Sequence, residues 1–299
     1  MAVSVVKSIC RAMEAIAPLR LAEKWDNVGL LLESPIVRPN ANRVLLTIDL
    51  TEAVTEEALA SPTSFIVSYH PTIFKPLTSL TLANPLQSNL LRCAAAGISV
   101  YCPHTSLDNV SGGINDWLGT VVAGKPTLNN RYKEIGYKIS VIGEENATRV
   151  EGGSGRIVTL PEPISMSELE WRIKSCLELE HIQVGYPHDM ASDVKSIRTV
   201  AICAGSGESV LLGVDADAYF TGEMTHHSVL AAVASGHFVV LCGHTNTERG
   251  YLPILAHKLK EQLLSRFEVD EHEEEKINAA LRSLEVHVSE ADKHPLRIV

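Results

Sequence analysis

Residues 101–108 read YCPHTSLD, and residues 241–248 read LCGHTNTE. Aligned without a gap, the two octapeptides share Cys, His and Thr, and each ends on a carboxylate, Asp108 in the first and Glu248 in the second. Each follows an apolar run of strand length, and each precedes a sequence with helical character. Three identities in eight positions are weak by themselves, but the shared placement and chemistry favour duplication of one α/β unit.

An alternation of apolar strands and amphipathic helices surrounds both motifs. The expected strands are 44–49, 65–68 and 98–102 around the first motif and 199–203, 218–220 and 238–242 before the second. Helices are expected between them, for example over 85–96 and 225–235. This order predicts an α/β fold, namely a duplicated three-layer α/β/α unit with mixed sheets.

The expected domain organisation follows from this repeat. Residues 1–124 form the first α/β repeat, 125–198 a connecting segment, and 199–299 the second repeat. Ligands of open α/β sheets bind beyond the carboxyl ends of strands, so the metal site is expected between the repeats. The acidic run at 268–276 is expected to be solvated.

Composition narrows the classes of partner. The chain of 299 residues has 26 Lys and Arg against 36 Asp and Glu, a formal net charge of −10, so direct nucleic-acid binding is not expected. Its six cysteines form no CxxC pair, which is typical of buried thiols in a reducing compartment. No apolar run is long enough to span a membrane, and the N-terminus lacks the pattern of a targeting signal. A cytoplasmic location is expected, with the nucleus and the mitochondrion left open.

The repeated motifs place metal-ligating side chains at a regular spacing. His104 and Asp108 lie four positions apart, as do His244 and Glu248, and residues at this spacing share one face of a helical turn. His70 ends another strand. Three imidazoles and two carboxylates can hold one or two divalent ions. Mixed nitrogen and oxygen ligation suits zinc, manganese, iron or cobalt better than calcium.

Each of these residues taken singly also has a structural explanation. A lone histidine after a strand is usually a hydrogen-bonded structural residue, Asp108 can cap the following helix, and Glu248 can pair with Arg249. Glu223 follows the expected strand at 218–220. It is expected to fix the orientation of a metal-ligating side chain by a hydrogen bond, without binding the ion itself. Taken together, the set favours a metal centre.

Further motifs run along nearly the whole chain. They are WDNVGLLL at 25–32, LLTIDLTEAVTEEA at 45–58, SYHPTIF at 68–74, HTSLDNVSGGIND at 104–116, GSGR at 153–156, AGSG at 204–207, TGEMTHH at 221–227, GHTNTERG at 243–250 and VHVSEADKHPL at 286–296. The chain therefore resembles the Nif-three-like family, also called GTP cyclohydrolase 1 type 2 homologues, and its SYHP and GHTNTERG motifs resemble the eukaryotic branch.

The resemblance implies a dinuclear metal site with His70, Asp108, His244 and Glu248 as ligands. This chain departs from the bacterial pattern at Tyr69, which replaces the first histidine of a pair. With an ordinary pKa of about 10, tyrosine is a poor ligand at neutral pH. One metal position is thus expected to be weaker, empty or completed by His104. The resemblance also implies a homohexamer.

Two functions are expected from these features. The first is a metal-dependent hydrolase acting on a small nucleotide or phosphoester-like substrate, with one or two divalent ions per chain and His104 as proton shuttle or further ligand. The alternative is a non-catalytic scaffold that interacts with a transcription regulator and carries a structural or degenerate metal site.

Overall fold

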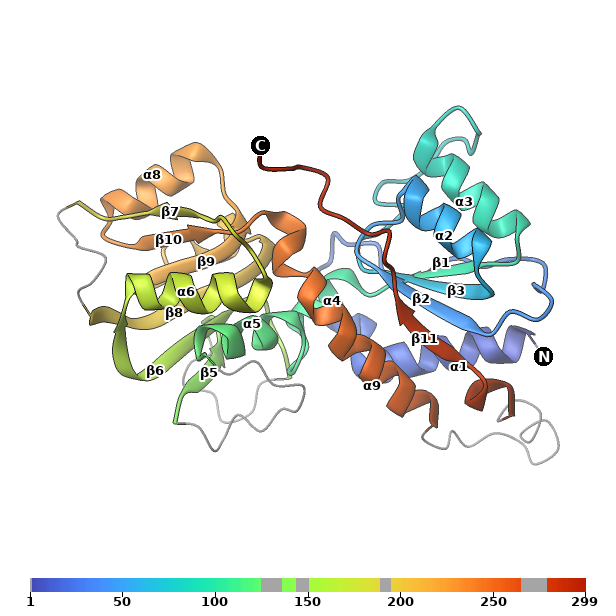
Figure 1. Ribbon diagram of the computed structural model, residues 1–299, viewed down its shortest axis with the longest axis horizontal. Coiled ribbons are helices and arrows are strands. Elements are labelled where there is room, and N and C mark those ends of the chain that lie inside the picture. The colour runs from blue at the N-terminus through green and yellow to red at the C-terminus, as the bar shows by residue number, and fades with distance from the viewer. Residues whose placement is uncertain (1, 125–135, 144–150, 189–194, 265–278) are drawn as a thin grey trace. The chain divides into compact units, whose positions relative to one another are not determined.

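The computed structural model describes residues 2–124, 136–143, 151–188, 195–264 and 279–299, coloured along the chain in Figure 1. The chain divides into two compact units. The first unit contains residues 1–107 and 252–299, and the second contains residues 108–251.

The first unit is built on a five-stranded mixed sheet. Its strand order is β1-β4-β3-β2-β11, in which β1 runs antiparallel to β4 and the other neighbours are parallel. Parallel strands are covered on both faces, and β2 and β3 accordingly carry almost continuous buried residues. The strands are β1 (Gly29–Leu32), β2 (Arg43–Thr47), β3 (Thr63–Ser68), β4 (Ser99–Cys102) and β11 (Glu285–Val288).

Helices cover both faces of this sheet. Figure 1 shows α2 (Glu52–Ala60) and α3 (Pro85–Ala95) on one side and α1 (Ala2–Ile16) and α9 (Leu252–Leu264) on the other. The core beneath α2 and α3 packs Val54 and Leu90 against Ile66 and Val100 of the sheet. The first unit is therefore a three-layer α/β/α structure.

The second unit contains a six-stranded mixed sheet. Its order is β5-β6-β8-β9-β10-β7, with β8, β9 and β10 parallel and the outer strands antiparallel to their neighbours. The strands are β5 (Lys138–Val141), β6 (Arg156–Ser165), β7 (Gln183–Gly185), β8 (Lys195–Ser206), β9 (Ala218–Glu223) and β10 (Phe238–Leu241).

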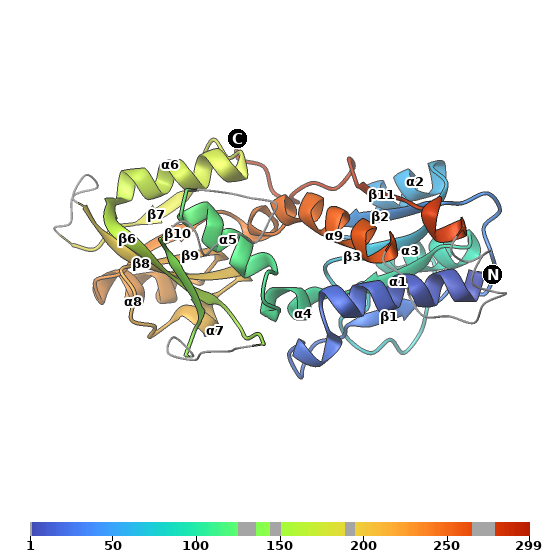
Figure 2. The same cartoon turned by 90° about the horizontal axis from the view of Figure 1, so that it is seen from below.

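This second sheet is also covered on both faces. A core of Leu211, Ala232 and Tyr219 places α7 (Glu208–Leu211) and α8 (His226–Ala234) on one face. On the other face lie α5 (Ile114–Val122) and α6 (Met166–Leu177), as Figure 2 shows from a second side. A Cβ at Gly119 of α5 would stand 3.2 Å from the Val158 side chain, so this glycine permits close packing of helix on sheet.

The two units repeat one topology. In the first, the edge strand β1 lies antiparallel to β4, followed by β3 and β2. In the second, β7 lies antiparallel to β10, followed by β9 and β8, in the same chain order. The helices between equivalent strands also correspond, α2 with α7 and α3 with α8. The predicted α/β fold with mixed sheets is confirmed.

The unit boundaries differ from the boundaries expected at residues 124 and 198. The segment 125–198 supplies β5, β6, α6 and β7 to the second unit, because β6 pairs along β8 from Arg156–Ile202 to Thr159–Thr199. At the other end of the chain, β11 and α9 belong to the first unit, where Val286 pairs with Val44. Both changes come from strand pairing between segments distant in sequence. The acidic run 268–276 lies outside the described residues.

Across the described part of the chain, no helix combines the length and the apolar character needed to cross a membrane.

Candidate metal centre

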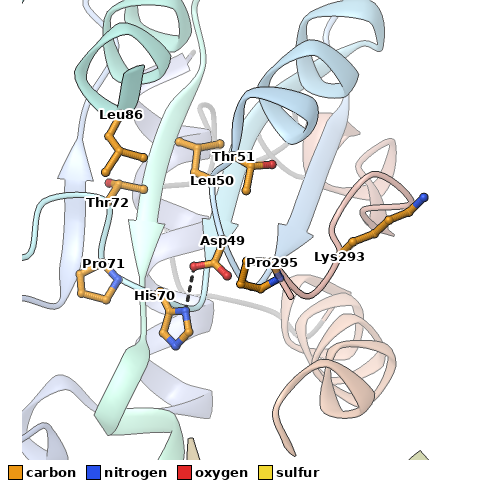
Figure 3. A pocket seen from close by; sticks show the side chains of 9 residues that line it. All are labelled: Asp49, Leu50, Thr51, His70, Pro71, Thr72, Leu86, Lys293 and Pro295. Atoms are coloured by element: carbon orange, nitrogen blue, oxygen red, sulfur yellow. Dashed lines mark hydrogen bonds and ion pairs between the residues drawn. The ribbon is translucent and has the colours of Figure 1, made fainter. Parts of the chain in front are cut away.

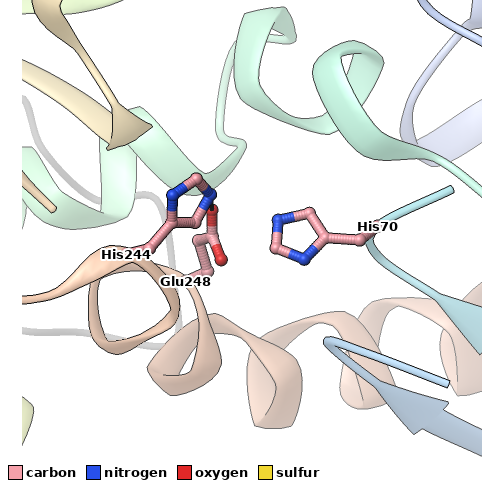
Figure 4. A group of neighbouring side chains, drawn as sticks. All are labelled: His70, His244 and Glu248. Carbon is pink, nitrogen blue, oxygen red and sulfur yellow. Dashed lines mark ion pairs between the residues drawn. The ribbon is translucent and has the colours of Figure 1, made fainter. Parts of the chain in front are cut away.

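In the second unit, His244 and Glu248 form a close imidazole–carboxylate pair (Figure 4). His244 Nε2 lies 3.3 Å from Glu248 Oε1. The intervening turn is the 3₁₀ helix η3 (His244–Thr247) rather than the α-helical turn that the spacing suggested. The side chain of Glu248 is only 2% exposed, whereas that of His244 is 32% exposed. A buried carboxylate beside an imidazole nitrogen is a donor set that could hold a divalent ion.

The other nitrogen of this imidazole is also bound. His244 Nδ1 lies 2.9 Å from Oε1 of Glu223 at the end of β9. A carboxylate at this position accepts the Nδ1 proton and leaves the Nε2 lone pair available to a metal. The sequence predicts that Glu223 orients a metal ligand, and a hydrogen bond to Nδ1 of His244 is the contact that this role requires.

Two glycines make room for this group. Gly205 has φ +64°, and a Cβ there would stand 2.7 Å from Glu248 Oε1 and 2.9 Å from His244 Nε2. A Cβ at Gly222 would stand 2.7 Å from the Cα atom of His244. The glycines of the AGSG motif and of the TGEMTHH motif therefore supply backbone space around the pair.

A substitution at Gly205 tests this spacing. We expect Gly205→Ala to reduce stability by about 1–2 kcal/mol from the positive φ and to weaken divalent-ion binding, because the methyl group displaces Glu248 and His244. The matched control is Gly213→Ala, where φ is +83° but no atom lies within 4 Å of the added Cβ. Thermal unfolding should show reduced stability in both variants. Isothermal titration with Zn²⁺ should show weaker binding in Gly205→Ala alone, and equal zinc affinities in the two variants would contradict the assignment.

The first unit holds two further imidazoles in the same manner. His70 Nδ1 lies 2.9 Å from Asp49 Oδ1, and His104 Nδ1 lies 2.8 Å from Asp26 Oδ1. The His70 and His104 ring centroids are 5.5 Å apart. The buried Tyr69 ring contacts both, with centroid distances of 5.0 Å and 5.5 Å. Each imidazole again presents its Nε2 away from a carboxylate that holds Nδ1.

The contact between Asp26 and His104 also fixes the backbone. His104 has φ +31°, an unfavourable value for a residue with a Cβ. Asp26, whose side chain is fully buried, accepts hydrogen bonds from His104, from the Thr105 amide at 3.1 Å and from the Thr105 hydroxyl. Burial by itself raises the pKa of Asp26, but these hydrogen bonds outweigh burial and hold its pKa below the ordinary value.

The lowered pKa of Asp26 predicts a pH-dependent loss of stability. We expect Asp26→Asn to reduce the free energy of unfolding by about 1.5–3 kcal/mol at pH 7, because a charge-assisted network is lost. A depressed carboxyl pKa stabilises the fold above the unfolded pKa of about 4 and stops doing so as the pH falls through the folded pKa. The difference in the free energy of unfolding between wild type and variant should therefore disappear as the pH is lowered.

Urea unfolding at a series of pH values measures this gap. Asp215→Asn is the control, because Asp215 is exposed and should show no such gap. A difference for Asp26→Asn that stayed constant from pH 7 to pH 3 would mean that the charge of Asp26 contributes nothing.

Asp108 occupies a different setting from the other predicted ligands. It lies on α4 (His104–Asn109), half-buried, and its backbone carbonyl accepts a hydrogen bond from Asn115 Nδ2 at 3.2 Å. Asn115 Oδ1 in turn accepts the Ala204 amide at 2.8 Å, so Asn115 joins the Asp108 turn to the AGSG segment. The carboxylate that contacts His104 Nδ1 is that of Asp26.

A buried arginine organises the chain beside Asp108. Arg156 is 1% exposed and forms two hydrogen bonds to Asp116 Oδ2, at 3.0 Å and 2.8 Å. It also donates to the backbone carbonyls of Asn109 and Val110, both at 3.1 Å. The GSGR motif is thus explained by structure, because Arg156 fixes the turn that follows the first repeated motif.

A pocket of about 350 Å³ opens beside His70 and Asp49 (Figure 3). Two hydroxyl-bearing residues, Thr51 and Thr72, line it together with apolar side chains. Lys293 lines it as well and extends its amine away from the His70–Asp49 pair. The pocket lies at the carboxyl ends of parallel strands β2 and β3, where α/β sheets commonly bind ligands.

Sequence reasoning missed two of the residues that hold these imidazoles. The sequence predicts Asp49 only as the last residue of the strand at 44–49, although it stands at a strand end just as His70 does. The sequence places Asp26 only within the WDNVGLLL motif at 25–32, with no role of its own. That reading omits its contact with His104, which is 78 positions away and leaves no local signal.

The fold and these contacts define an α/β protein with a repeated sheet topology and carboxylate-bound histidines at strand ends. The chain belongs to the family described as Duf34/NIF3 (NGG1p interacting factor 3), whose model matches residues 4–278. The predicted family membership is thereby confirmed.

Relatives of this family occur in fungi and animals. The chain is 48% identical over 244 residues to Protein NIF3 homolog of Schizosaccharomyces pombe, covering 81% of this chain and 84% of that protein. It is 38% identical to NIF3-like protein 1 of Drosophila melanogaster, with 97% and 87% covered. It is also 38% identical to NGG1-interacting factor 3 of Saccharomyces cerevisiae, with 82% and 86% covered.

Solved structures support the same fold. A Bacillus cereus protein related to NIF3 matches with a TM-score of 0.72 at 20% identity, covering 98% of both chains. A hypothetical protein of Staphylococcus aureus matches with a TM-score of 0.74 at 24% identity, covering 98% of this chain and 99% of that one.

Proposed function

We propose that this protein is a metal-dependent hydrolase of small nucleotide or phosphoester-like substrates. In this proposal His70, Asp108, His244 and Glu248 bind one or two divalent ions, with zinc, manganese, iron and cobalt as candidates. The observation that carries the proposal is the repeated contact in which a carboxylate holds Nδ1 of a histidine at a strand end. Histidines that bind metals are commonly oriented in this way.

The donor chemistry of the side chains supports the proposal. His70, His244 and Glu248 each offer one ligand atom of a type that binds first-row divalent ions. When bound, a divalent ion would act as a Lewis acid and make a nearby water molecule more acidic. Tyr69 stands where the bacterial pattern has a histidine. In this proposal its buried ring does not bind metal but holds the rings of His70 and His104 in place.

In this proposal His104 carries a proton during the reaction. With Nδ1–H donated to Asp26, its Nε2 is the basic nitrogen and can accept a proton. Asp26 would stabilise the imidazolium that results, because the carboxylate is buried and already bound to the ring. A substrate would lie in the pocket beside His70, where Leu50 and Leu86 would offer apolar contacts and the hydroxyls of Thr51 and Thr72 would offer hydrogen bonds.

Metal affinity and hydrolysis in three glutamate variants test the proposal. We expect Glu248→Gln to abolish one equivalent of bound metal, and Glu223→Gln to weaken metal binding by about 10–100-fold, because Glu223 orients a ligand without binding the ion. Glu261→Gln is the matched control: Glu261 also pairs with a histidine four residues away, His257 Nε2 at 3.2 Å, but on an exposed helix face. Metal content would be measured by elemental analysis and affinity by competition with a chelator.

Hydrolysis of p-nitrophenyl phosphate and of nucleoside triphosphates would then be measured with zinc, manganese, iron and cobalt. Turnover by wild type and by Glu261→Gln, with loss in Glu248→Gln, is the expected result. Metal binding without turnover of any substrate would reject the hydrolase and favour the second function. Failure to bind any of the four metals would reject the metal centre itself.

The second candidate function is interaction with a transcription regulator. One relative carries the name NGG1-interacting factor 3. The first unit also exposes large apolar side chains, among them Trp25 at 61% and Phe74 at 51%, whose ring centroids lie 6.0 Å apart, and adjacent exposed apolar residues often mark protein interaction sites. Under this function, Phe74→Ser would reduce partner binding while leaving metal content unchanged.

A homohexamer and a cytoplasmic location are part of the proposal. A hexamer should sediment at six times the mass of the chain, and a monomer in sedimentation analysis would reject it.

A further inference from the structure

A second pocket, separate from the carboxylate-bound histidines, lies in the first unit between helix α1 and strands β1 and β4. It has a volume of about 440 Å³. Figure 2 shows α1 running beside β1, and side chains from both elements line this pocket. We call it the α1 pocket.

One face of α1 forms a wall of the α1 pocket. Val6, Lys7, Cys10, Arg11 and Glu14 all line it, and their spacing of three and four residues places them on one side of the helix. Apolar surface on the facing side comes from Leu19 and Leu30. The pocket thus combines an apolar interior with charged side chains on the helix.

The floor of the pocket carries a buried hydroxyl. Tyr101 lines the pocket, is 2% exposed, and its hydroxyl has no hydrogen-bond partner among the described residues. Its neighbour in the strand, Val100, faces the core under α2 and α3, so alternation along β4 directs Tyr101 toward α1. Burial, together with the nearby Cys10, Glu14 and Cys102, raises the pKa of Tyr101.

An unsatisfied buried hydroxyl is unfavourable, because it has lost its hydrogen bonds to water. A bound molecule that offers an acceptor to Tyr101 would restore that bond. The Tyr101 hydroxyl stays protonated at neutral pH, since its pKa is raised. It therefore acts as a donor toward an incoming acceptor.

The charged side chains that line the pocket affect which ligands it can bind. Lys7 and Arg11 are four residues apart on the pocket side of α1. Glu14 already accepts a hydrogen bond from the Leu19 amide at 3.0 Å, whereas Glu33 stands at the β1 side of the pocket. An anionic group would be attracted by Lys7 and Arg11 and opposed by Glu14 and Glu33.

We propose that the α1 pocket binds a small amphipathic organic acid. Its apolar body would lie against Leu19 and Leu30, its anionic group beside Lys7 and Arg11, and a polar acceptor against the Tyr101 hydroxyl. The proposal is independent of the hydrolase, because none of these residues belongs to the proposed metal centre.

Anilinonaphthalene sulfonate is a suitable probe, because it joins an apolar aromatic body to one anionic group. Its fluorescence rises in an apolar site, so a titration of the full-length protein gives a dissociation constant. We expect saturable binding that weakens by roughly 3–5-fold in Arg11→Gln, where one attraction is lost. We expect it to tighten by a similar factor in Glu33→Gln, where a repulsion is removed.

Three further variants locate the probe. Tyr101→Phe should weaken binding by roughly fivefold through loss of one hydrogen bond. Cys10→Trp should abolish binding by filling the pocket, and Lys75→Gln, an exposed cation beside Phe74, should leave it unchanged. The Arg11 and Glu33 variants keep the pocket volume, so they decide the matter if Cys10→Trp fails to fold.

The proposal is overturned if the probe does not bind. It is also overturned if the Arg11 and Glu33 variants bind as wild type does, or if Lys75→Gln alone weakens binding, since the probe would then occupy the exposed apolar group around Phe74.

Discussion

The hydrogen bond from a histidine Nδ1 to a carboxylate is the constraint on which the site depends. Asp49, Asp26 and Glu223 each hold one imidazole, at distances of 2.8–2.9 Å. Such a bond fixes both the ring orientation and the tautomer, and it leaves Nε2 as the nitrogen with a lone pair. The surrounding backbone is arranged around these rings, with Gly205 and Gly222 giving space in the second unit and His104 held at an unfavourable φ in the first.

Much of the fold could be predicted from local sequence patterns. The expected strand at 218–220 lies within β9, and the expected helix at 225–235 matches α8 closely. The strand contains a short buried apolar run, Ala218 to Phe220, and the helix lies between Thr225 and Gly236, residue types that begin and end helices. The repeated octapeptides predicted a duplication, and the two sheets repeat one strand order.

The remaining features depend on contacts between distant segments. The pairing of β11 with β2, which joins residues more than 200 positions apart, has no local signature and moved the unit boundary away from the expected one. Nothing in the sequence around Asp26 indicates that it contacts His104, which lies 78 positions away. Arg156 shows the same principle, because a lone arginine after glycines gives no sign that it will be buried against Asp116.

The central claim concerns which nitrogen of each histidine is available to metal. A crystal structure of the zinc-loaded protein, with zinc located by anomalous scattering, tests it directly. We expect zinc to be bound to His244 Nε2 and to a carboxylate oxygen of Glu248, with His244 Nδ1 still hydrogen-bonded to Glu223. Zinc bound to Nδ1 in place of Glu223, or zinc found only at residues outside this group, would contradict it.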